Sequence, residues 1–297
     1  MTARTGTLAV IGRPNVGKST LTNRLVGAKV SITSRKAQTT RHQVRGILTT
    51  EVGGDDCQFV FVDTPGFQTQ HKNALNRLMN RSVTQALADV DVVLFLIEAG
   101  RWGGGEREIV RLLPKDHPVV LVINKVDQMA DKALLLPFIE KTAAEYPFAE
   151  IVPLSAEKGK GVDELLKATA RYLPEQPHIF DADDITDRPE RFLAAELLRE
   201  KLFRNLGEEL PYGIAVEIEK FEQEGGLRRI HAAVVVDKAA HKAIVIGKGG
   251  ERLKRMSSDA RKDMEQLFGG KVWLETWVKV KSGWADDERA LKTLGYE

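Results

Sequence analysis

Hydrophobic runs alternate with amphipathic stretches along the first 173 residues. The runs are rich in Val, Ile, Leu and Phe and most have no polar face, which is typical of parallel strands covered by helices on both sides. The predicted strands lie at residues 7–12, 57–63, 91–98, 118–124 and 150–155. The predicted helices lie at residues 17–26, 74–88, 105–113, 131–145 and 161–172. This alternation predicts an α/β fold with a doubly wound, mainly parallel sheet.

A polar, proline-containing stretch at residues 174–189 breaks the alternation and is predicted to be a linker. Beyond it the pattern predicts a helix, two adjacent strands, a second helix and a last strand. These elements lie at residues 190–206, 212–221, 228–236, 249–268 and 271–280. Two adjacent strands between helices indicate a separate α+β module. We therefore expect one domain at residues 1–173 and another at residues 190–297.

Composition adds limits to this picture. A hydrophobic fraction of 42% over 297 residues suits two globular domains, and a net charge of +2 gives the whole chain no bias toward nucleic acid. The single cysteine, Cys57, cannot form an internal disulfide, which fits a reducing cytosol. No apolar run approaches the roughly 18–20 residues that span a bilayer, and the first residues lack the apolar core of a signal peptide. We expect a cytoplasmic protein that is at most peripheral to a membrane.

Residues 12–19 read GRPNVGKS, directly after a predicted strand and at the start of a predicted helix. In that context the pattern G-x-x-x-x-G-K-S predicts a P-loop, whose backbone N–H groups surround phosphates. Lys18 would reach the β- and γ-phosphates, and the Ser19 hydroxyl would bind Mg²⁺. The nucleotide-binding residues predicted here are Gly12, Arg13, Pro14, Asn15, Val16, Gly17, Lys18 and Ser19.

Two further motifs follow at strand ends. DTPG at 63–66 places the Asp63 carboxylate where it can hold Mg²⁺, and the Gly66 N–H where it can contact the γ-phosphate. NKVD at 124–127 supplies the Asp127 carboxylate, which can accept two hydrogen bonds from guanine and none of that kind from adenine. The nucleotide-binding residues predicted from these motifs are Asp63, Thr64, Pro65, Gly66, Phe67, Asn124, Lys125, Val126 and Asp127.

SAEKG at 155–159 adds Ser155 and Ala156 to the predicted site, with the Ala156 N–H supporting guanine O6. Because the four motifs all follow strands, they should meet at the carboxyl edge of the sheet. Guanine nucleotide is the predicted ligand. A P-loop ATPase or kinase is the competing enzyme class, and NKVD argues against it. An RNA-binding protein with a purely structural nucleotide domain is the non-enzymatic alternative, and the presence of Lys18, Ser19 and Asp63 argues against it.

The segment SITSRKAQTTRHQVRG at 31–46 has four Arg or Lys residues and no acid. A threonine here is needed to close over Mg²⁺ and the γ-phosphate. Thr40 is our choice and Thr39 is the alternative, so the predicted Mg²⁺ ligands are Ser19, Thr40 and Asp63. The basic side chains of this segment are equally well explained as a solvated loop.

The second module contains IGKGGERLKRM at 246–256, a GxxG loop before a helix with an apolar stripe. Residues 238–262 hold eight Lys or Arg and two acids, a local basic excess that suits RNA phosphates. We expect a KH-type RNA-binding module. Its predicted RNA-binding residues are Gly247, Lys248, Gly249, Gly250 and Arg252. Trp273 and Trp277 share one face of the last strand, and we expect them in the core rather than stacked on bases.

Several segments resemble the Era branch of translation-linked GTPases. GRPNVGKSTL, KAQTTRHQVRGI, FVDTPGF and INKVD are similar to that family's motifs in order and spacing, and the resemblance continues through ELPYGIAVEIEKF, AIVIGKGGERLKRM and VKVKSGWADDERAL. It covers essentially the whole chain. It implies a P-loop NTPase domain, a type II KH domain, GTP, GDP and Mg²⁺ as ligands, and a monomer. It also implies binding to 16S rRNA near its 3′ end during assembly of the 30S subunit. It leaves open whether the family's peripheral association with the inner membrane applies here.

The expected reaction is hydrolysis of GTP to GDP and phosphate. Ras-like enzymes orient the attacking water with a glutamine directly after DxxG, but that position here is Phe67. Similar GTPases with an asparagine at the position of Asn15 bind K⁺ beside the phosphates, and the alternative is that Asn15 only stabilises the loop turn. The catalytic residues predicted are Asn15, Lys18, Thr40, Asp63 and Gly66.

Overall fold

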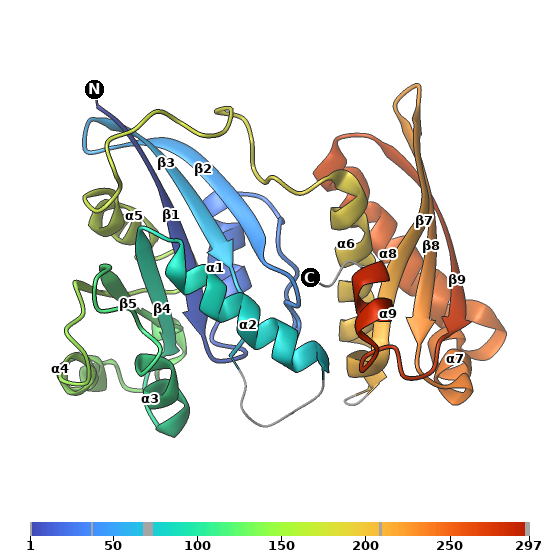
Figure 1. Ribbon diagram of the computed structural model, residues 1–297, viewed down its shortest axis with the longest axis horizontal. Helices are drawn as coiled ribbons and strands as arrows, with labels where there is room; N and C mark the ends of the chain where they lie inside the picture. The colour runs from blue at the N-terminus through green and yellow to red at the C-terminus, as the bar shows by residue number, and fades with distance from the viewer. Residues whose placement is uncertain (1, 37, 68–73, 208–209, 295–297) are drawn as a thin grey trace. The chain divides into compact units, whose positions relative to one another are not determined.

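The computed structural model describes residues 2–36, 38–67, 74–207 and 210–294 (Figure 1). By their contacts the residues form two compact units. The first unit consists of Met1–Ser31, Thr40–Gln70 and Met79–Asp187. The second consists of Ile32–Thr39, His71–Leu78 and Arg188–Glu297. Two short segments from the N-terminal half of the chain therefore belong to the second unit.

The first unit is built on a sheet whose strand order is β2-β3-β1-β4-β5-β6. Its strands are β1 Ala3–Gly12, β2 Val44–Val52, β3 Asp55–Asp63, β4 Val92–Glu98, β5 Val119–Asn124 and β6 Glu150–Pro153. All neighbouring pairs are parallel except β2 and β3. The prediction of a doubly wound, mainly parallel sheet is confirmed.

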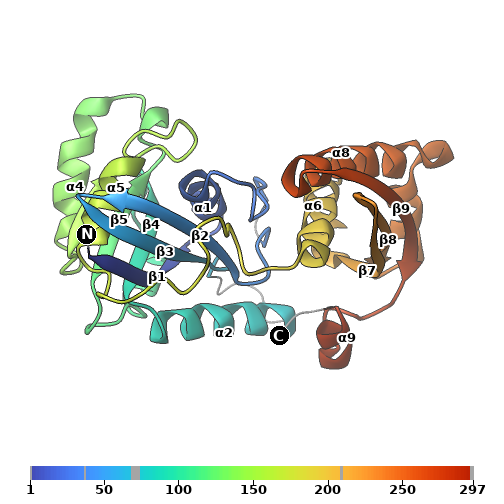
Figure 2. The ribbon, with the colours of Figure 1, turned by 90° about the horizontal axis from the view of Figure 1, so that it is seen from above.

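Helices cover both faces of this sheet, with α1 and α2 on opposite sides of the strands in Figure 2. Alternate side chains of the central strands enter two separate cores. One core packs against α1 Lys18–Val26 and α5 Val162–Ala170. The other packs against α2 Ala74–Ala88, α3 Gly104–Val110 and α4 Leu135–Ala143. Burial on both faces explains why these strands read as continuous apolar runs.

Strand β2 was not predicted from the sequence, because the basic stretch before it has the composition of a loop. Val44–Val52 pairs antiparallel with β3, and Gly53 and Gly54 join the two strands with φ of 64° and 92°. Two consecutive positive φ angles are typical of the two-residue hairpin turn that Gly-Gly favours. The Gly-Gly pair was therefore the signal for this hairpin.

The predicted linker begins as an ordered strap along the first unit. The side chain of Gln58 in β3 has no exposed surface, and its Oε1 accepts hydrogen bonds from the backbone N–H groups of Ile179 (2.8 Å) and Phe180 (3.0 Å). Further along, Ile47 N–H of β2 donates to Ile185 O at 2.9 Å. By these contacts the strap belongs to the first unit up to Asp187. The domain limits at 173 and 190 stay a prediction.

The second unit has a three-stranded sheet in the order β7-β8-β9, with β7 and β8 antiparallel and β8 and β9 parallel. Its elements are α6 Glu190–Asn205, β7 Ile214–Glu224, β8 Leu227–Val236, α7 Ala239–Ile246, α8 Glu251–Phe268, β9 Lys271–Val280 and α9 Glu288–Thr293. Its core is formed by α6, α8 and one sheet face. The short helices α7 and α9, of eight and six residues, were not predicted from the sequence.

The prediction for two tryptophans was wrong. Trp273 is 42% exposed and, with Trp277, flanks the His231 ring at centroid distances of 5.2 and 6.2 Å. Val272 and Val278 of the same strand are the buried positions. Because β9 packs against helices on one face only, its tryptophan face is left toward solvent. Trp284, just after the strand, is the buried indole, and its N–H donates to Gly213 O at 3.2 Å.

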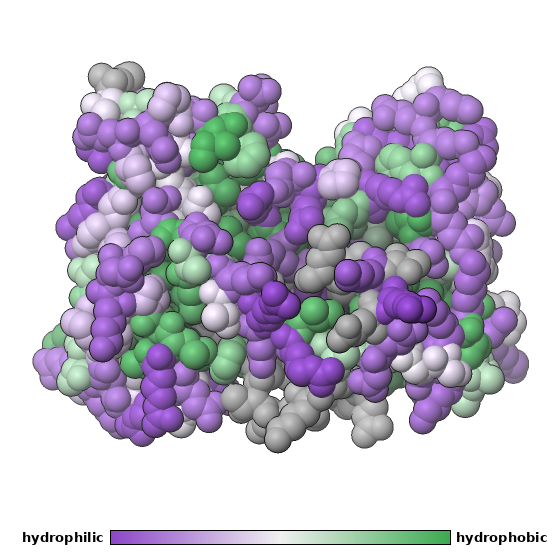
Figure 3. Space-filling view, in the orientation of Figure 1, coloured by the Kyte–Doolittle hydropathy of each residue, from purple (hydrophilic) through white to green (hydrophobic). Residues whose placement is uncertain are grey.

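The surface drawn in Figure 3 is mainly hydrophilic, with small separate apolar areas. Within the described ranges, no helix combines the length and the apolar character needed to cross a bilayer.

Candidate functional site

The loop between β1 and α1 has the backbone that a phosphate-binding loop needs. Gly17, the residue before α1, has a φ of 103°, and a Cβ there would lie 2.3 Å from Asn124 Nδ2. Gly12 has a φ of 152°, and a Cβ there would lie 2.4 Å from Leu96 O. Both positions therefore exclude any side chain. The loop leads into the N-terminus of α1, whose N–H groups favour an anion.

Lys18 lies inside this loop. Its side chain is buried, and its Nζ donates to Gly12 O at 3.1 Å and to Arg13 O at 3.0 Å. Burial lowers the pKa of Lys18 from 10.5 to about 8, although the charge of Asp63 opposes this shift. A phosphate beside Lys18 would stabilise the charged form and raise this pKa again.

Three of the predicted residues meet around the Asp63 carboxylate. Ser19 Oγ donates to Asp63 Oδ2 at 2.6 Å, and Ser19 Oγ and Thr40 Oγ1 are 2.8 Å apart. Ser31, which the sequence analysis did not select, also donates to Asp63 Oδ2, at 2.5 Å. Burial raises the pKa of Asp63, and the hydrogen bonds from Ser19 and Ser31 oppose that rise.

The donor set fits a hard divalent cation. Asp63 is buried, and its Oδ1 has no hydrogen-bond partner among the residues that the structure describes. A carboxylate oxygen and two hydroxyl oxygens are the ligand types that Mg²⁺ prefers, with phosphate and water oxygens completing the shell. In the described part of the chain there is no cluster of three or more His, Cys, Asp or Glu side chains for a metal ion.

The two candidate threonines differ in their surroundings. Thr40 lies at Ser19, whereas Thr39 Oγ1 donates to the backbone carbonyl of Lys36 at 2.6 Å. The geometry favours Thr40 as the Mg²⁺ ligand, and that assignment stays a prediction.

The DTPG turn packs directly on the phosphate loop. Thr64 Oγ1 donates to Val10 O of β1 at 2.8 Å. A Cβ on Gly66 would lie 2.9–3.0 Å from three atoms of Pro14. Phe67, by contrast, is partly buried against the apolar core on the α2 side of the sheet. The turn therefore brings the backbone of Gly66 to the phosphate loop. Residue 67 contributes no polar side chain there, because it is a phenylalanine.

Asn124 joins the loops at the base-binding end. Its Nδ2 donates to Val16 O of the phosphate loop at 2.8 Å. Its Oδ1 accepts from Lys125 N–H at 2.8 Å and from Ala156 N–H at 3.0 Å. The Ala156 N–H, expected to face guanine O6, is thus donated to Asn124 in this structure. The SAEKG turn is nevertheless at the site, with Ser155 buried beside it.

The Asp127 carboxylate is available to a ligand. Its Oδ1 is buried, and within the described ranges it accepts no hydrogen bond. Lys125 has a left-handed backbone, with φ of 63°, and its Nζ contacts Glu98 Oε2 at 2.7 Å. Glu98, which was not predicted from the sequence, fixes the ammonium end of Lys125 through this ion pair. Its position as the last residue of β4 was the available signal.

The GxxG loop of the second unit connects α7 to α8. Gly247, Gly249 and Gly250 have φ of 73°, 59° and 81°, and a Cβ on Gly249 or Gly250 would meet nothing within 4 Å. The loop therefore leaves open space in which a backbone can approach. Lys248 is exposed, and Arg252 is exposed while its NH1 donates to Ile244 O at 2.8 Å.

A groove of about 420 Å³ continues from this loop. It is lined by Gly250, Leu253, Lys254, Ser257, Ser258, Arg261, Leu274, Glu275 and Thr276. The α8 residues recur at helical spacing from the loop onward, which places them on one face. The lining combines two leucines with hydroxyl groups, two basic side chains and one acid, Glu275. Apolar, hydroxyl and basic groups together suit unstacked bases and their phosphates. The loop was predicted from the sequence, and the groove was not.

Comparisons with known proteins match both parts of the chain. The family model described as "50S ribosome-binding GTPase" matches residues 7–125, and the KH domain model matches residues 209–285. GTPase Era of Nitrosomonas eutropha is 57% identical over 294 residues, which cover 99% of this chain and 98% of that protein. The chain belongs to the GTPase Era family. It is a GTP-hydrolysing enzyme with a P-loop domain followed by a KH domain.

Other members of the Era family are similarly close. GTPase Era of Chromobacterium violaceum is 58% identical and covers 98% of this chain and 97% of its own length. A crystal structure of Era in complex with MgGDPNP and nucleotides 1506–1542 of 16S ribosomal RNA has a TM-score of 0.93 at 40% identity, covering 99% of both chains. A variant of Aquifex aeolicus Era bound to GDP and aluminium fluoride has a TM-score of 0.94, also at 40% identity and 99% coverage of both chains.

The pKa of Lys18 makes nucleotide binding dependent on pH. Because that pKa is about 8 and a phosphate raises it, GDP binding should take up a proton above pH 8, and affinity should fall as pH rises through this range. We expect uptake of up to about one proton at pH 8.5 and almost none at pH 7. Calorimetric titrations in buffers of different ionisation enthalpy measure this number. Lys18→Met is the control for titration of the guanine ring, and equal uptake by both proteins at pH 8.5 would contradict the prediction.

Proposed function

We propose that this GTPase binds the 3′ end of 16S rRNA through its KH unit and assists assembly of the 30S ribosomal subunit in the cytoplasm. The observation that carries the RNA assignment is the open, basic GxxG loop continuing into the α8–β9 groove. The complex of a 40% identical Era with nucleotides 1506–1542 of 16S rRNA supports this choice of RNA. The family resemblance supports a monomer and leaves association with the inner membrane open.

In the first unit, the proposed roles follow the geometry. Asp127 selects guanine, because its buried oxygen needs a donor that the guanine edge provides. Ser19, Thr40 and Asp63 hold Mg²⁺, which when bound neutralises charge on the β- and γ-phosphates. Lys18 contributes a positive charge at the same phosphates, and the Gly66 N–H reports the presence of the γ-phosphate.

The water-orienting group of Ras-like enzymes has no counterpart at Phe67, whose ring packs on the apolar core. We propose that a K⁺ ion near Asn15 supplies part of the missing stabilisation. Asn15 is exposed on the phosphate loop with a left-handed backbone, φ of 66°. Its amide oxygen is a suitable ligand for a monovalent cation, and charge placed between the β- and γ-phosphates would act as an arginine finger does.

Base selection is tested by Asp127→Asn. The new amide presents a donor where guanine also donates, so GTP affinity should fall on the order of 100-fold or more and xanthosine triphosphate should become the preferred ligand. Equilibrium binding of both nucleotides measures the change. Wild-type affinity for GTP in this variant would refute the assignment of NKVD as the base site.

RNA binding is tested by Lys248→Asp combined with Gly249→Asp. Negative charge opposes phosphate and the added side chains fill the open space, so affinity for a single-stranded 16S rRNA 3′ fragment should fall at least about tenfold at physiological salt. GTP affinity should not change. The matched control is Lys271→Asp with Gly225→Asp, because Gly225 also has a left-handed backbone, φ of 54°, outside the loop. Equal losses in both double variants would argue against the loop as the RNA site.

The cation proposal is tested by GTP turnover in K⁺ and in Na⁺ at equal ionic strength. Wild-type turnover should be about tenfold or more higher in K⁺, and Asn15→Ala should lose most of this difference. If wild-type turnover is the same in both salts, the K⁺ role is excluded and external groups must complete the site.

A further inference from the structure

The two oxygens of the Asp63 carboxylate have different surroundings. Oδ2 accepts hydrogen bonds from Ser19 Oγ at 2.6 Å and from Ser31 Oγ at 2.5 Å. Oδ1 is buried and accepts no hydrogen bond from the residues that the structure describes. Two donors on one oxygen restrict the orientation of the carboxylate, and the other oxygen is the one left for a cation.

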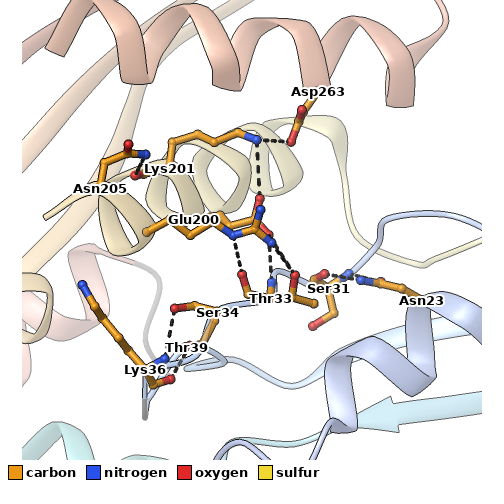
Figure 4. Close-up of polar contacts among 11 residues, drawn as sticks. Asn23, Ser31, Thr33, Ser34, Lys36, Thr39, Glu200, Lys201, Asn205 and Asp263 are labelled. Atoms are coloured by element: carbon orange, nitrogen blue, oxygen red, sulfur yellow. Dashed lines mark hydrogen bonds and ion pairs between the residues drawn. The ribbon is translucent and has the colours of Figure 1, made fainter. Parts of the chain in front are cut away.

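Ser31 can orient this carboxylate because its own position is fixed by Asn23 of α1. Asn23 Nδ2 donates to Ser31 O at 2.6 Å, and Asn23 Oδ1 accepts from Ser31 N–H at 2.8 Å, as Figure 4 shows. One side-chain amide therefore pairs with both backbone polar groups of one residue. Ser31 is buried, so water has little access to its hydroxyl. The backbone contacts of Ser31 thus keep its hydroxyl beside Asp63.

Both donors to Oδ2 depend on the same helix of the first unit. Ser19 and Asn23 lie four residues apart on α1, which places them on one side of that helix. Ser19 contacts Asp63 directly, and Asn23 acts on it through Ser31. Because α1 begins at the phosphate loop, the orientation of the carboxylate is tied to the helix whose N-terminus favours the phosphates.

The two serines differ in what a bound cation requires of them. Ser19 is a predicted Mg²⁺ ligand, so a lone pair of its hydroxyl oxygen would bind the cation. Ser31 is not a predicted ligand, and its hydroxyl can keep its hydrogen bond to Asp63 Oδ2 when the cation is present. Residues that hold a metal ligand in place in this way typically change metal affinity by roughly 10- to 100-fold when they are replaced.

We propose that Ser31 is a positioning residue for the Mg²⁺ ion of the nucleotide site, which orients Asp63 so that Oδ1 is left for the cation, and that Asn23 fixes Ser31 for this role. This inference rests on the proposed role of Ser19 and Asp63 as Mg²⁺ ligands. The competing explanation is that Ser31 only satisfies a buried carboxylate and so stabilises the fold. Positioning changes the response of the site to Mg²⁺, whereas general stabilisation of the fold does not.

The experiment measures the release of GDP with a fluorescent ribose label from the full-length chain over a range of free Mg²⁺ concentrations. GDP is used because Thr40 is expected to act only when a γ-phosphate is present. In Ser31→Ala, the Mg²⁺ concentration for half-maximal slowing of release should rise about tenfold, while GDP affinity in EDTA stays within about twofold. Asn23→Ala should give a smaller rise. Because Asn23 is only partly buried, this variant keeps the test valid if Ser31→Ala unfolds.

The matched control is Thr169→Val, which removes another buried hydroxyl of the first unit, one that donates to Leu165 O at 2.8 Å within α5. Its response to Mg²⁺ should equal that of the wild type. A wild-type response in Ser31→Ala, an equal change in Thr169→Val, or a loss of GDP affinity by Ser31→Ala that is as large in EDTA as in Mg²⁺ would overturn the proposal. Asp63→Asn tests the underlying assignment by itself, because an unchanged Mg²⁺ response there would remove Asp63 from the Mg²⁺ site whatever Ser31 does.

Discussion

A buried carboxylate that needs positive charge organises the first unit. Asp63 has no exposed surface, and the hydroxyls of Ser19 and Ser31 only partly replace the water that it loses. Burying an unneutralised carboxylate is costly, which is why burial raises the pKa of Asp63. A divalent cation beside it relieves that cost. Ser31 bonds to Asp63, and Thr40 contacts Ser19, which itself bonds to Asp63. The two ends of the segment between residues 31 and 40 are therefore held beside this carboxylate.

The base-binding end depends on Asn124 in a comparable way. One amide side chain bonds Val16 in the phosphate loop, Lys125 in its own turn and Ala156 in the turn after β6. Three loops from distant parts of the sequence are thereby held in fixed positions relative to one another. Such a bidirectional use of donor and acceptor is possible for an amide and impossible for a carboxylate, which only accepts. The glycine at position 17 belongs to the same arrangement, because the Asn124 amide occupies the space of its missing side chain.

The parts of the structure that follow from short-range patterns were predictable, and those that depend on tertiary contacts were not. Apolar runs and glycine motifs placed the sheet, the phosphate loop and the GxxG loop, because their residues act on the local backbone. β2 was missed since its basic neighbours resemble a loop. Trp273 was misplaced because an apolar strand does not reveal whether one or both of its faces are covered. The hydrogen bond from Ser31 to Asp63 joins residues far apart in the sequence, and no single-chain pattern marks such a pair.

The strap after residue 173 has a consequence for how the protein behaves among its own copies. β2 is the edge strand of the first sheet, and a bare edge presents N–H and C=O groups that can pair with another chain. Ile185 accepts the Ile47 N–H of that edge, and Thr186 Oγ1 donates to the carbonyl of Arg45 nearby. The chain thus covers its own open edge with the segment that leads to the RNA-binding unit. Cleavage of this segment would uncover a template for strand addition, so an intact connection also protects the first unit against edge-to-edge aggregation.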